Sequence, residues 1–308
     1  MSNFLSNPFQ SPLNKLLRDI TPSANENKLA DSAFDTVRKK MQQMVEQRSL
    51  PVLNPEIITL VGSHYRETDI SPLQHIDVFL EIDSSLVDVH VKGDTLSLVT
   101  KDNVLSTCVD DSLHVLPQKL VSALQVTFSQ HFPATISSTG QSIKIQLEKE
   151  KFFVRITPSF AWDHSFFVPQ EKSELLWRRV SPYKEKAILD QVNQLHNGNI
   201  KSVIRCVKLW NELRNNESFR NYHLEAIAYT IFREIPTATH NVMEALELYV
   251  NQMPRYIYNC PDPTGLDTPI HTYLPDNIDQ WYLFMNRIAE LKTAIKSGEK
   301  SLVALLKI

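Results

Sequence analysis

Glycine is scarce in this chain, with six glycines among 308 residues against 17 prolines. Glycine-rich loops that hold phosphates need several glycines within a few residues, so a dinucleotide-binding fingerprint and a Walker loop are excluded. Cysteine is scarce as well, and Cys108, Cys206 and Cys260 show no CxxC or metal-type spacing. We therefore expect buried free thiols, a reducing compartment and a cytoplasmic location.

An excess of charge of one sign is also missing, because the formal net charge is −3. The chain as a whole therefore has no strong attraction for nucleic acid or for an anionic membrane. Since no run of about 18 apolar residues occurs, we expect no transmembrane helix. The first residues lack a basic start followed by an apolar run, so we expect no secretion signal. Hydrophobic residues make up 42% of the chain, which is typical of a globular protein with a real core.

Three regions follow one another along the chain. Residues 1–30 are rich in Asn, Ser and Pro and predict a loosely packed arm. From Asp31, a plausible cap, apolar residues at steps of three and four predict an amphipathic helix. Strand-like segments then dominate residues 31–168, although residues 116–133 also carry a helix pattern, and residues 169–308 show helical spacing. This order predicts an α+β lobe packed on an α-helical lobe, with a cleft between them.

The stretch "VGSHYRETDISPLQHIDVFLEID", residues 61–83, combines features that serve phosphate and metal chemistry. A tight Gly62-Ser63 turn offers backbone N–H groups and a hydroxyl to phosphates. Residues two apart on the strand that follows point to one face, so a D-x-D pair there could bind two magnesium ions. Such ions activate an attacking oxygen and stabilise a leaving one. Here the pair reads His75-Ile76-Asp77, so the first acid is a histidine.

This order of a Gly-Ser turn, a threonine and a D-x-D strand resembles the signature of the polymerase-β-like nucleotidyltransferases. The segments "IKSVIRCVKLW", "NYHLEAIAY", "DPTG" and "SGEKSLVALLKI" narrow the resemblance to the CD-NTase family. These proteins are bacterial relatives of cyclic GMP-AMP synthase and oligoadenylate synthetase, and the resemblance spans residues 31–308. It implies a nucleotidyltransferase palm and a C-terminal helical lobe, with a nucleotide bound between them.

The resemblance also implies which residues bind the nucleotide. Gly62 and Ser63 match the phosphate turn, and Thr68 matches the threonine that closes that loop. The remaining matches lie in the region with helical spacing.

Lys208 in "VKLW" matches a lysine that contacts the triphosphate tail of the donor, although an isolated lysine on an amphipathic helix is often simply solvated. Tyr222 matches an aromatic residue that stacks on a base, and core packing is the alternative for it. Asn221 stands where the relatives usually carry serine, which removes the expected hydroxyl contact to a phosphate.

The third acid of the family is expected in a strand that here reads "VRITPSF", with Arg155 in the acid's place. Magnesium prefers several oxygen ligands, so the remaining Asp77 is a poor anchor by itself. Two unit charges of one sign about 4 Å apart repel by about 4 kcal/mol at a surface-like dielectric, which disfavours a dication beside Arg155. Arg155 is well suited to pair with Asp77 instead. The sequence therefore predicts a pseudo-enzyme without a bound metal.

Other side chains could still complete a metal site. Glu81 shares a strand face with Asp77, and Asp163, Glu148 and Glu150 lie near Arg155 in the sequence. His75 could bind Mn²⁺ or Zn²⁺, or could be a hydrogen-bonded histidine without a metal.

Three functions stay open at this point. The first is a non-catalytic regulator or sensor that binds a nucleoside triphosphate, a nucleotide-derived ligand or a protein partner from a defence operon. The resemblance implies that such a role would lie in antiphage defence signalling. The second is an active synthase that makes a cyclic or linear oligonucleotide with Mg²⁺ and atypical ligands. The third is a docking scaffold with an empty cleft.

Overall fold

The computed structural model describes residues 11–47, 58–92, 95–101, 103–147, 153–170, 176–215, 219–266 and 278–307. The chain divides into two compact units. We call Met1–Pro22, Glu67–Pro72 and Lys184–Ile308 the helical unit, and Ser23–Arg66 with Leu73–Tyr183 the sheet unit. The sequence predicted limits after residues 30 and 168, whereas the chain changes unit after residues 22, 66, 72 and 183. The predicted cleft between lobes stays a prediction.

The sheet unit is built on a mixed seven-stranded sheet, in which β1, β2, β7, β6 and β5 lie side by side in that order. β2 and β7 are parallel, while β1 with β2, β7 with β6, and β6 with β5 are antiparallel. β8 pairs with β7 and with β9. The strands are β1 (Ile58–Val61), β2 (His75–Ile82), β5 (Ala134–Ser138), β6 (Ile143–Leu147), β7 (Phe153–Trp162), β8 (Ser165–Pro169) and β9 (Trp177–Val180).

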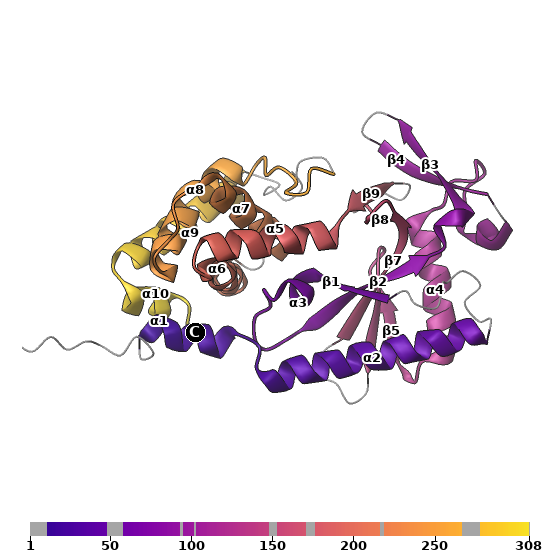
Figure 1. Cartoon of the computed structure of the whole chain (residues 1–308), viewed down its shortest axis with the longest axis horizontal. Coiled ribbons are helices and arrows are strands. Elements are labelled where there is room, and N and C mark those ends of the chain that lie inside the picture. Colours follow the sequence, from indigo (N-terminus) through magenta and orange to yellow (C-terminus); the bar gives the residue numbers. More distant parts are fainter. Residues whose placement is uncertain are drawn as a thin grey trace, which may run out of the picture. The chain divides into compact units, whose positions relative to one another are not determined.

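Alternation along the central strands gives this sheet two different faces. On β2, Ile76, Val78, Leu80 and Ile82 are buried, whereas the four residues between them are half-buried. The buried face packs against α2 (Ala24–Glu46) and α4 (Pro117–His131), both visible beside the sheet in Figure 1. The opposite face carries His75, Asp77, Phe79 and Glu81.

The sheet unit also contains a hairpin and three short helical elements. β3 (Val87–Lys92) and β4 (Thr95–Thr100) form a separate two-stranded sheet. The short elements are α3 (Gly62–Arg66), η2 (Ser84–Leu86) and η3 (Asn103–Cys108).

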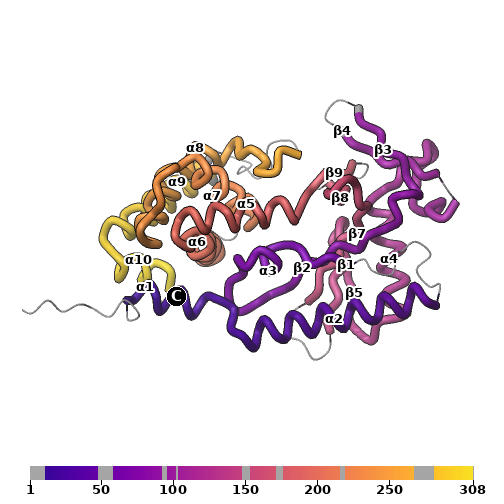
Figure 2. Tube along the Cα trace, in the orientation of Figure 1, coloured from indigo at the N-terminus to yellow at the C-terminus, as the bar shows by residue number. Residues whose placement is uncertain are grey.

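The helical unit has its own apolar core. Its helices are α1 (Pro12–Ile20), most of α5 (Pro182–Leu195), α6 (Asn199–Asn215), α7 (Asn221–Glu234), α8 (Val242–Tyr256), α9 (Ile278–Lys296) and α10 (Glu299–Leu305). α1, from the start of the sequence, lies beside α10, from its end (Figures 1 and 2). No helix in the described ranges is both long and apolar enough to cross a membrane.

The N-terminal region corrects two predictions from the sequence. Residues 12–20 are not a loose arm, because Leu13, Leu16 and Ile20 of α1 are buried in the core of the helical unit. α2 begins at Ala24 rather than after Asp31. Its N-cap is Ser23, which exchanges hydrogen bonds with Glu26 in a capping box, so the helix starts where those two residues satisfy its free N–H groups.

Candidate functional site

Asp77 and Arg155 form a hydrogen-bonded ion pair on the half-buried face of the sheet. They are register partners on the adjacent parallel strands β2 and β7, which brings their side chains together. Arg155 Nε donates a hydrogen bond to Asp77 Oδ1 at 2.5 Å. The Asp77 side chain is 16% exposed and that of Arg155 is 38% exposed. The pairing expected from charge alone is therefore present in the structure.

The second carboxylate oxygen of Asp77 faces His75. His75 Nε2 lies 3.6 Å from Asp77 Oδ2, and the imidazole ring stacks on Phe153 with 5.2 Å between the ring centroids. Burial by itself would raise the pKa of Asp77. The polar contact from His75 and the charge of Arg155 outweigh this effect and hold the pKa well below its usual range. Asp77 is therefore a permanently charged carboxylate at neutral pH.

Gly62 occupies a place that other residues cannot enter without strain. β1 pairs with β2 so that Val61 lies opposite Asp77, and the chain turns into α3 at the next residue. Gly62 has a positive φ of 74°, and a Cβ there would collide with the carboxylate of Asp77. The predicted phosphate turn thus lies directly against the ion pair, with Ser63 half-buried in the same turn.

The residues around Asp77 do not fit a magnesium ion. One carboxylate oxygen accepts from a guanidinium and the other faces an imidazole, so neither points to a shared centre with a second acid. In the part of the chain that the structure describes, no three His, Cys, Asp or Glu side chains gather as metal ligands. Magnesium requires near-octahedral oxygen ligation, and a fixed cation stands at one of the positions that would supply it.

Two of the acids that could have completed the site, Glu81 and Asp163, make other contacts or stand at other register positions. Glu81 pairs in register with Ser159, while Asp77 pairs with Arg155 four positions earlier on each of those two strands. Burial raises the pKa of Glu81. Asp163 lies in the turn after β7, where its carboxylate is 3.4 Å from Arg179. Glu148 and Glu150 fall outside the described residues.

Sequence reasoning missed Lys144, which lies opposite Arg155 on β6. The signal was present in "SIKIQL", because Ile143 and Ile145 are buried and the residue between them must face the other way. Which residue lies opposite Lys144 on the next strand depends on the strand register, and the register cannot be read from this segment alone.

In the helical unit, Lys208 and Thr68 meet in a fully buried polar cluster. The ammonium of Lys208, 2% exposed, is 2.5 Å from Oε1 of Glu225, which is fully buried. It also donates to the carbonyl oxygen of Thr68 at 3.0 Å. The Thr68 hydroxyl and that of Tyr229 donate to the two carboxylate oxygens of Glu225, at 3.0 and 2.7 Å. The triphosphate contact expected of Lys208 stays a prediction, and in this structure the ammonium is engaged within the unit.

Two further cations of α6 hold the segment Glu67–Pro72, which we call the strap. Arg205 donates to the carbonyl oxygens of Asp69 and Glu67, and Lys201 pairs with the Glu67 carboxylate at 2.8 Å. Positions 201, 205 and 208 recur at helical spacing and so share one face of α6. The strap is therefore fixed to α6 along its first three residues, a feature that the sequence did not reveal.

The last two predicted residues stand at the start of α7. Asn221 is exposed in the first turn of the helix. Tyr222 is half-buried, and its hydroxyl donates to Glu185 Oε1 of α5 at 3.2 Å. A tyrosine with one end tied to a carboxylate retains a ring face for stacking, so its role stays a prediction.

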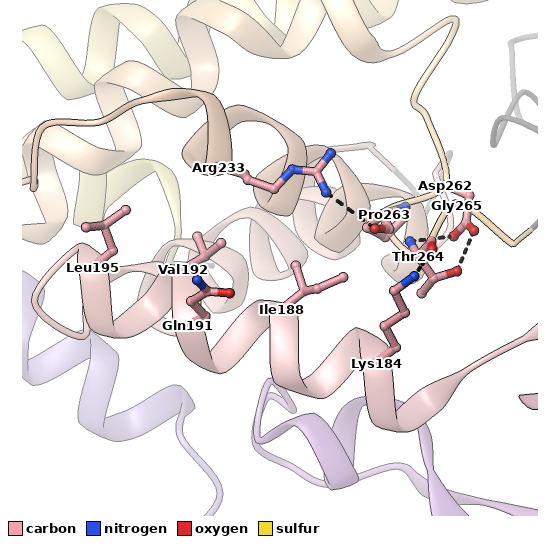
Figure 3. A pocket seen from close by; sticks show the side chains of 10 residues that line it. All are labelled: Lys184, Ile188, Gln191, Val192, Leu195, Arg233, Asp262, Pro263, Thr264 and Gly265. Atoms are coloured by element: carbon pink, nitrogen blue, oxygen red, sulfur yellow. Dashed lines mark hydrogen bonds between the residues drawn. The ribbon is translucent and has the colours of Figure 1, made fainter. Parts of the chain in front are cut away.

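A hollow of about 530 Å³ lies in the helical unit (Figure 3). Its lining residues are Lys184, Ile188, Gln191, Val192, Leu195, Arg233, Asp262, Pro263, Thr264 and Gly265. Figure 3 shows the Lys184 ammonium turned to the carbonyl oxygen of Thr264, at 2.5 Å, and Asp262 turned to the hydroxyl of the same threonine. The hollow contains none of the residues predicted for the nucleotide, and the polar contacts drawn there serve the local loop.

Comparison with known proteins identifies the family that the chain matches. The family described as Second Messenger Oligonucleotide or Dinucleotide Synthetase domain matches residues 8–193, more than half of the chain. A probable cyclic nucleotide synthase of Bacillus cereus (strain VD146) is 25% identical over 252 residues, which are 76% of this chain and 73% of that protein.

Two similar solved structures are of CdnC from E. coli MS115-1. The structure with ATP has a TM-score of 0.68 and covers 96% of this chain and 95% of its own. The complex with HORMA-deltaN has a TM-score of 0.66 and covers 96% of this chain and 94% of its own. Both are 13% identical to this chain, so the likeness concerns the fold.

Proposed function

The chain belongs to the Second Messenger Oligonucleotide or Dinucleotide Synthetase domain family, and from that premise we propose that it is a non-catalytic, nucleotide-binding member. These synthetases form the CD-NTase family, and the chain has their polymerase-β-like fold with a C-terminal helical lobe. The family is one of cyclic nucleotide synthases. The proposal concerns what this member does with the fold.

The Asp77–Arg155 pair carries the proposal. Two-metal nucleotidyl transfer requires several carboxylates around the ions, and here the guanidinium donates directly to the one that remains. Gly62 has the positive φ that a tight phosphate turn uses, which supports a phosphate-binding role for this turn. A site that keeps its phosphate turn and loses its metal ligands is suited to holding a nucleotide without consuming it.

The proposed role is a regulator or sensor in antiphage defence signalling. The resemblance to the CD-NTases motivates the setting, because such relatives largely act there. The solved relatives with ATP and with a HORMA protein support two kinds of ligand, a nucleoside triphosphate and a protein partner. We place the nucleotide on the sheet unit and leave the partner to be identified by co-purification.

An active synthase is the second candidate, favoured by the name of the Bacillus cereus relative. It requires a metal centre built from ligands other than the family's three acids. A docking scaffold that binds no nucleotide is the third.

One assay separates these functions. The purified chain is incubated with labelled nucleoside triphosphates and Mg²⁺ or Mn²⁺, and pyrophosphate release is measured. The proposal expects no release, together with a rise in melting temperature on adding nucleotide in EDTA. Ligand at a hundredfold excess over its Kd stabilises by about 2.7 kcal/mol, which such a scan detects. Metal-dependent release that disappears in Asp77→Ala would favour the active synthase, and no shift with any nucleotide would favour the scaffold.

A variant with the acids restored is the positive control. In His75→Asp combined with Arg155→Asp, three carboxylates would surround the former ion pair, so Mn²⁺ should raise the melting temperature of this variant and not that of the wild type. Equal stabilisation of both proteins by Mn²⁺ would contradict the proposed loss of the metal site.

A further inference from the structure

We propose that the half-buried face of the palm sheet binds a polyphosphate group directly, without a divalent cation, through Arg155 and Lys144. This inference rests on the proposed function, because it takes the phosphate tail of a nucleotide as the ligand. The inference assigns the phosphate tail to two side chains of the sheet unit. Lys144 is not among the positions inferred from the family resemblance.

Strand register places three charges in one row. Asp77 on β2 is the partner of Arg155 on β7, and Arg155 is in turn the partner of Lys144 on β6. Side chains at paired positions stand on the same face, with Cβ atoms about 5 Å apart. Asp77, Arg155 and Lys144 therefore cross three neighbouring strands as one acid followed by two cations.

The ion pair leaves part of Arg155 free to act as a donor. Its Nε is engaged by Asp77, and within the described ranges the structure shows no hydrogen bond from its two terminal nitrogens. The side chain as a whole is 38% exposed, which is more than the 16% of Asp77. A guanidinium anchored through Nε presents its terminal nitrogens in a fixed fork, which matches the oxygen spacing of a phosphate.

Lys144 supplies the charge that makes the row attractive to an anion. Its ammonium lies 4.8 Å from the centroid of the Phe153 ring, and that ring also stacks on His75. Among the described carboxylates, none lies within ion-pair distance of Lys144. The Asp77–Arg155 pair is neutral as a unit, so the ammonium leaves the row with one net positive charge. The ring holds this ammonium over Phe153, two residues before Arg155 on β7.

The chemical class follows from this arrangement. A fork and a separate point charge on one face match two neighbouring phosphate groups of a chain, one taken by each cation. In this proposal the two side chains make direct contacts to the phosphate oxygens, in place of the contacts that magnesium makes in metal-dependent sites. The ligand is therefore the polyphosphate tail of a nucleoside di- or triphosphate.

The test uses tripolyphosphate and ATP as probes, titrated calorimetrically into the whole chain in EDTA. Wild-type protein should bind both, and the affinity should fall as KCl is raised. Lys144→Met keeps the length of the side chain and removes the charge, so binding of both probes should weaken about tenfold or more. Lys144→Arg restores the charge and should recover most of the affinity.

The matched control is Lys39→Met, which removes an exposed lysine from α2, a helix on the other face of the same sheet. It should bind both probes as the wild type does. Melting temperatures of all variants, measured without ligand, show that each is folded.

The outcomes separate the inference from the proposed function. Equal binding by wild type and Lys144→Met, binding of tripolyphosphate that requires Mg²⁺, or no binding of tripolyphosphate would each overturn the inference. If wild type and Lys144→Met bind ATP equally in EDTA and neither turns it over, the inference is overturned and the proposed function still holds. Metal-dependent pyrophosphate release would overturn the proposed function itself.

Discussion

Asp77 is the residue whose protonation links the candidate site to the stability of the fold. Its pKa in the folded chain lies well below the value of about 3.9 for an unfolded aspartate. A carboxylate with a lowered folded pKa contributes stability that is complete above the unfolded pKa and is lost as the pH falls through the folded pKa. The stabilisation should therefore be present at pH 5 and decline below about pH 4.

Asp77→Asn should lower the free energy of unfolding by about 1–2 kcal/mol at pH 5, since Arg155 is partly screened by solvent. Below about pH 4 the difference from wild type should narrow by up to about 1.4 kcal/mol per pH unit, because only the wild type has a proton to gain on unfolding. Urea unfolding of both proteins at pH 5, 4 and 3 measures this difference in the free energy of unfolding. Asp88→Asn, at a carboxylate 60% exposed, is the control and should show little difference. A constant gap for Asp77→Asn from pH 5 to pH 3 would contradict the linkage.

Lys208 should be far more costly to neutralise than a surface lysine. In Lys208→Met the carboxylate of Glu225 stays fully buried without its cation, which should cost about 3–5 kcal/mol in urea unfolding. The double variant with Glu225→Gln removes the stranded charge and should recover part of this loss. Lys201→Met is the comparison, because its partners Glu67 and Asp190 are 64% and 43% exposed. Equal losses for Lys208→Met and Lys201→Met would show that burial of the first pair carries no special penalty.

At the scale of elements, the turn from β1 into α3 depends on Gly62 for two separable reasons. One is the positive φ, which costs a non-glycine residue about 1–2 kcal/mol. The other is the carboxylate of Asp77, which fills the space of a Cβ.

Gly140→Ala isolates the first of these reasons. Gly140 also has a positive φ, of 66°, but a Cβ there meets no atom within 4 Å. Gly62→Ala should therefore destabilise the chain by clearly more than Gly140→Ala, by about 1–3 kcal/mol beyond the backbone cost. Thermal unfolding of the two variants measures the difference. If the two losses match, the space beside Asp77 is not as tight as the structure indicates.

Several elements were predictable from local patterns, and others were not. The sequence predicted a strand after the Gly62-Ser63 turn, and the structure has β2 there, with Ile76, Val78, Leu80 and Ile82 buried. Residues 116–133 carried two patterns, and the helix α4 prevailed because Leu120, Val121, Leu124 and Phe128 share one face that packs on the sheet. The Arg155 pairing was predictable from charge alone.

The rest depended on contacts between residues distant in sequence. Glu225 follows the quoted "NYHL", yet its pairing with Lys208 arises from the packing of α6 against α7. The positions of the strap and of α1 also depend on packing. The residues of these segments do not by themselves indicate which helix they contact. Lys144 required the register of β6 on β7. Local periodicity encodes which face a residue takes, and not its neighbour on the next element.

At the scale of the molecule, the two units differ in how the chain supplies them. All residues of the sheet unit lie within the continuous stretch 23–183, whereas the helical unit also needs α1 and the strap. Burial of Leu13, Leu16 and Ile20 contributes about 1.5–3 kcal/mol each, a large part of the 5–15 kcal/mol that usually stabilises a domain.

A fragment of residues 23–183 should therefore unfold cooperatively in urea, and a fragment of residues 184–308 should not. In the second fragment Lys208 and Glu225 lack Thr68, and the core lacks α1. Circular dichroism during urea titration measures both. A sharp transition of the fragment 184–308 at the midpoint of the whole chain would contradict this dependence on distant segments.

The helical unit is built from segments that lie before and after the sheet unit in the sequence, so its parts are synthesised at different times. α1 is synthesised before the sheet unit, but its neighbour α10 is made only after the whole sheet unit has been synthesised. The sheet unit can fold during translation, since domains generally fold as units in the order in which they are synthesised. Until α10 is synthesised, the three apolar side chains of α1 that the helical unit buries have no core to pack into. We therefore expect α1 to be a segment that chaperones bind during synthesis.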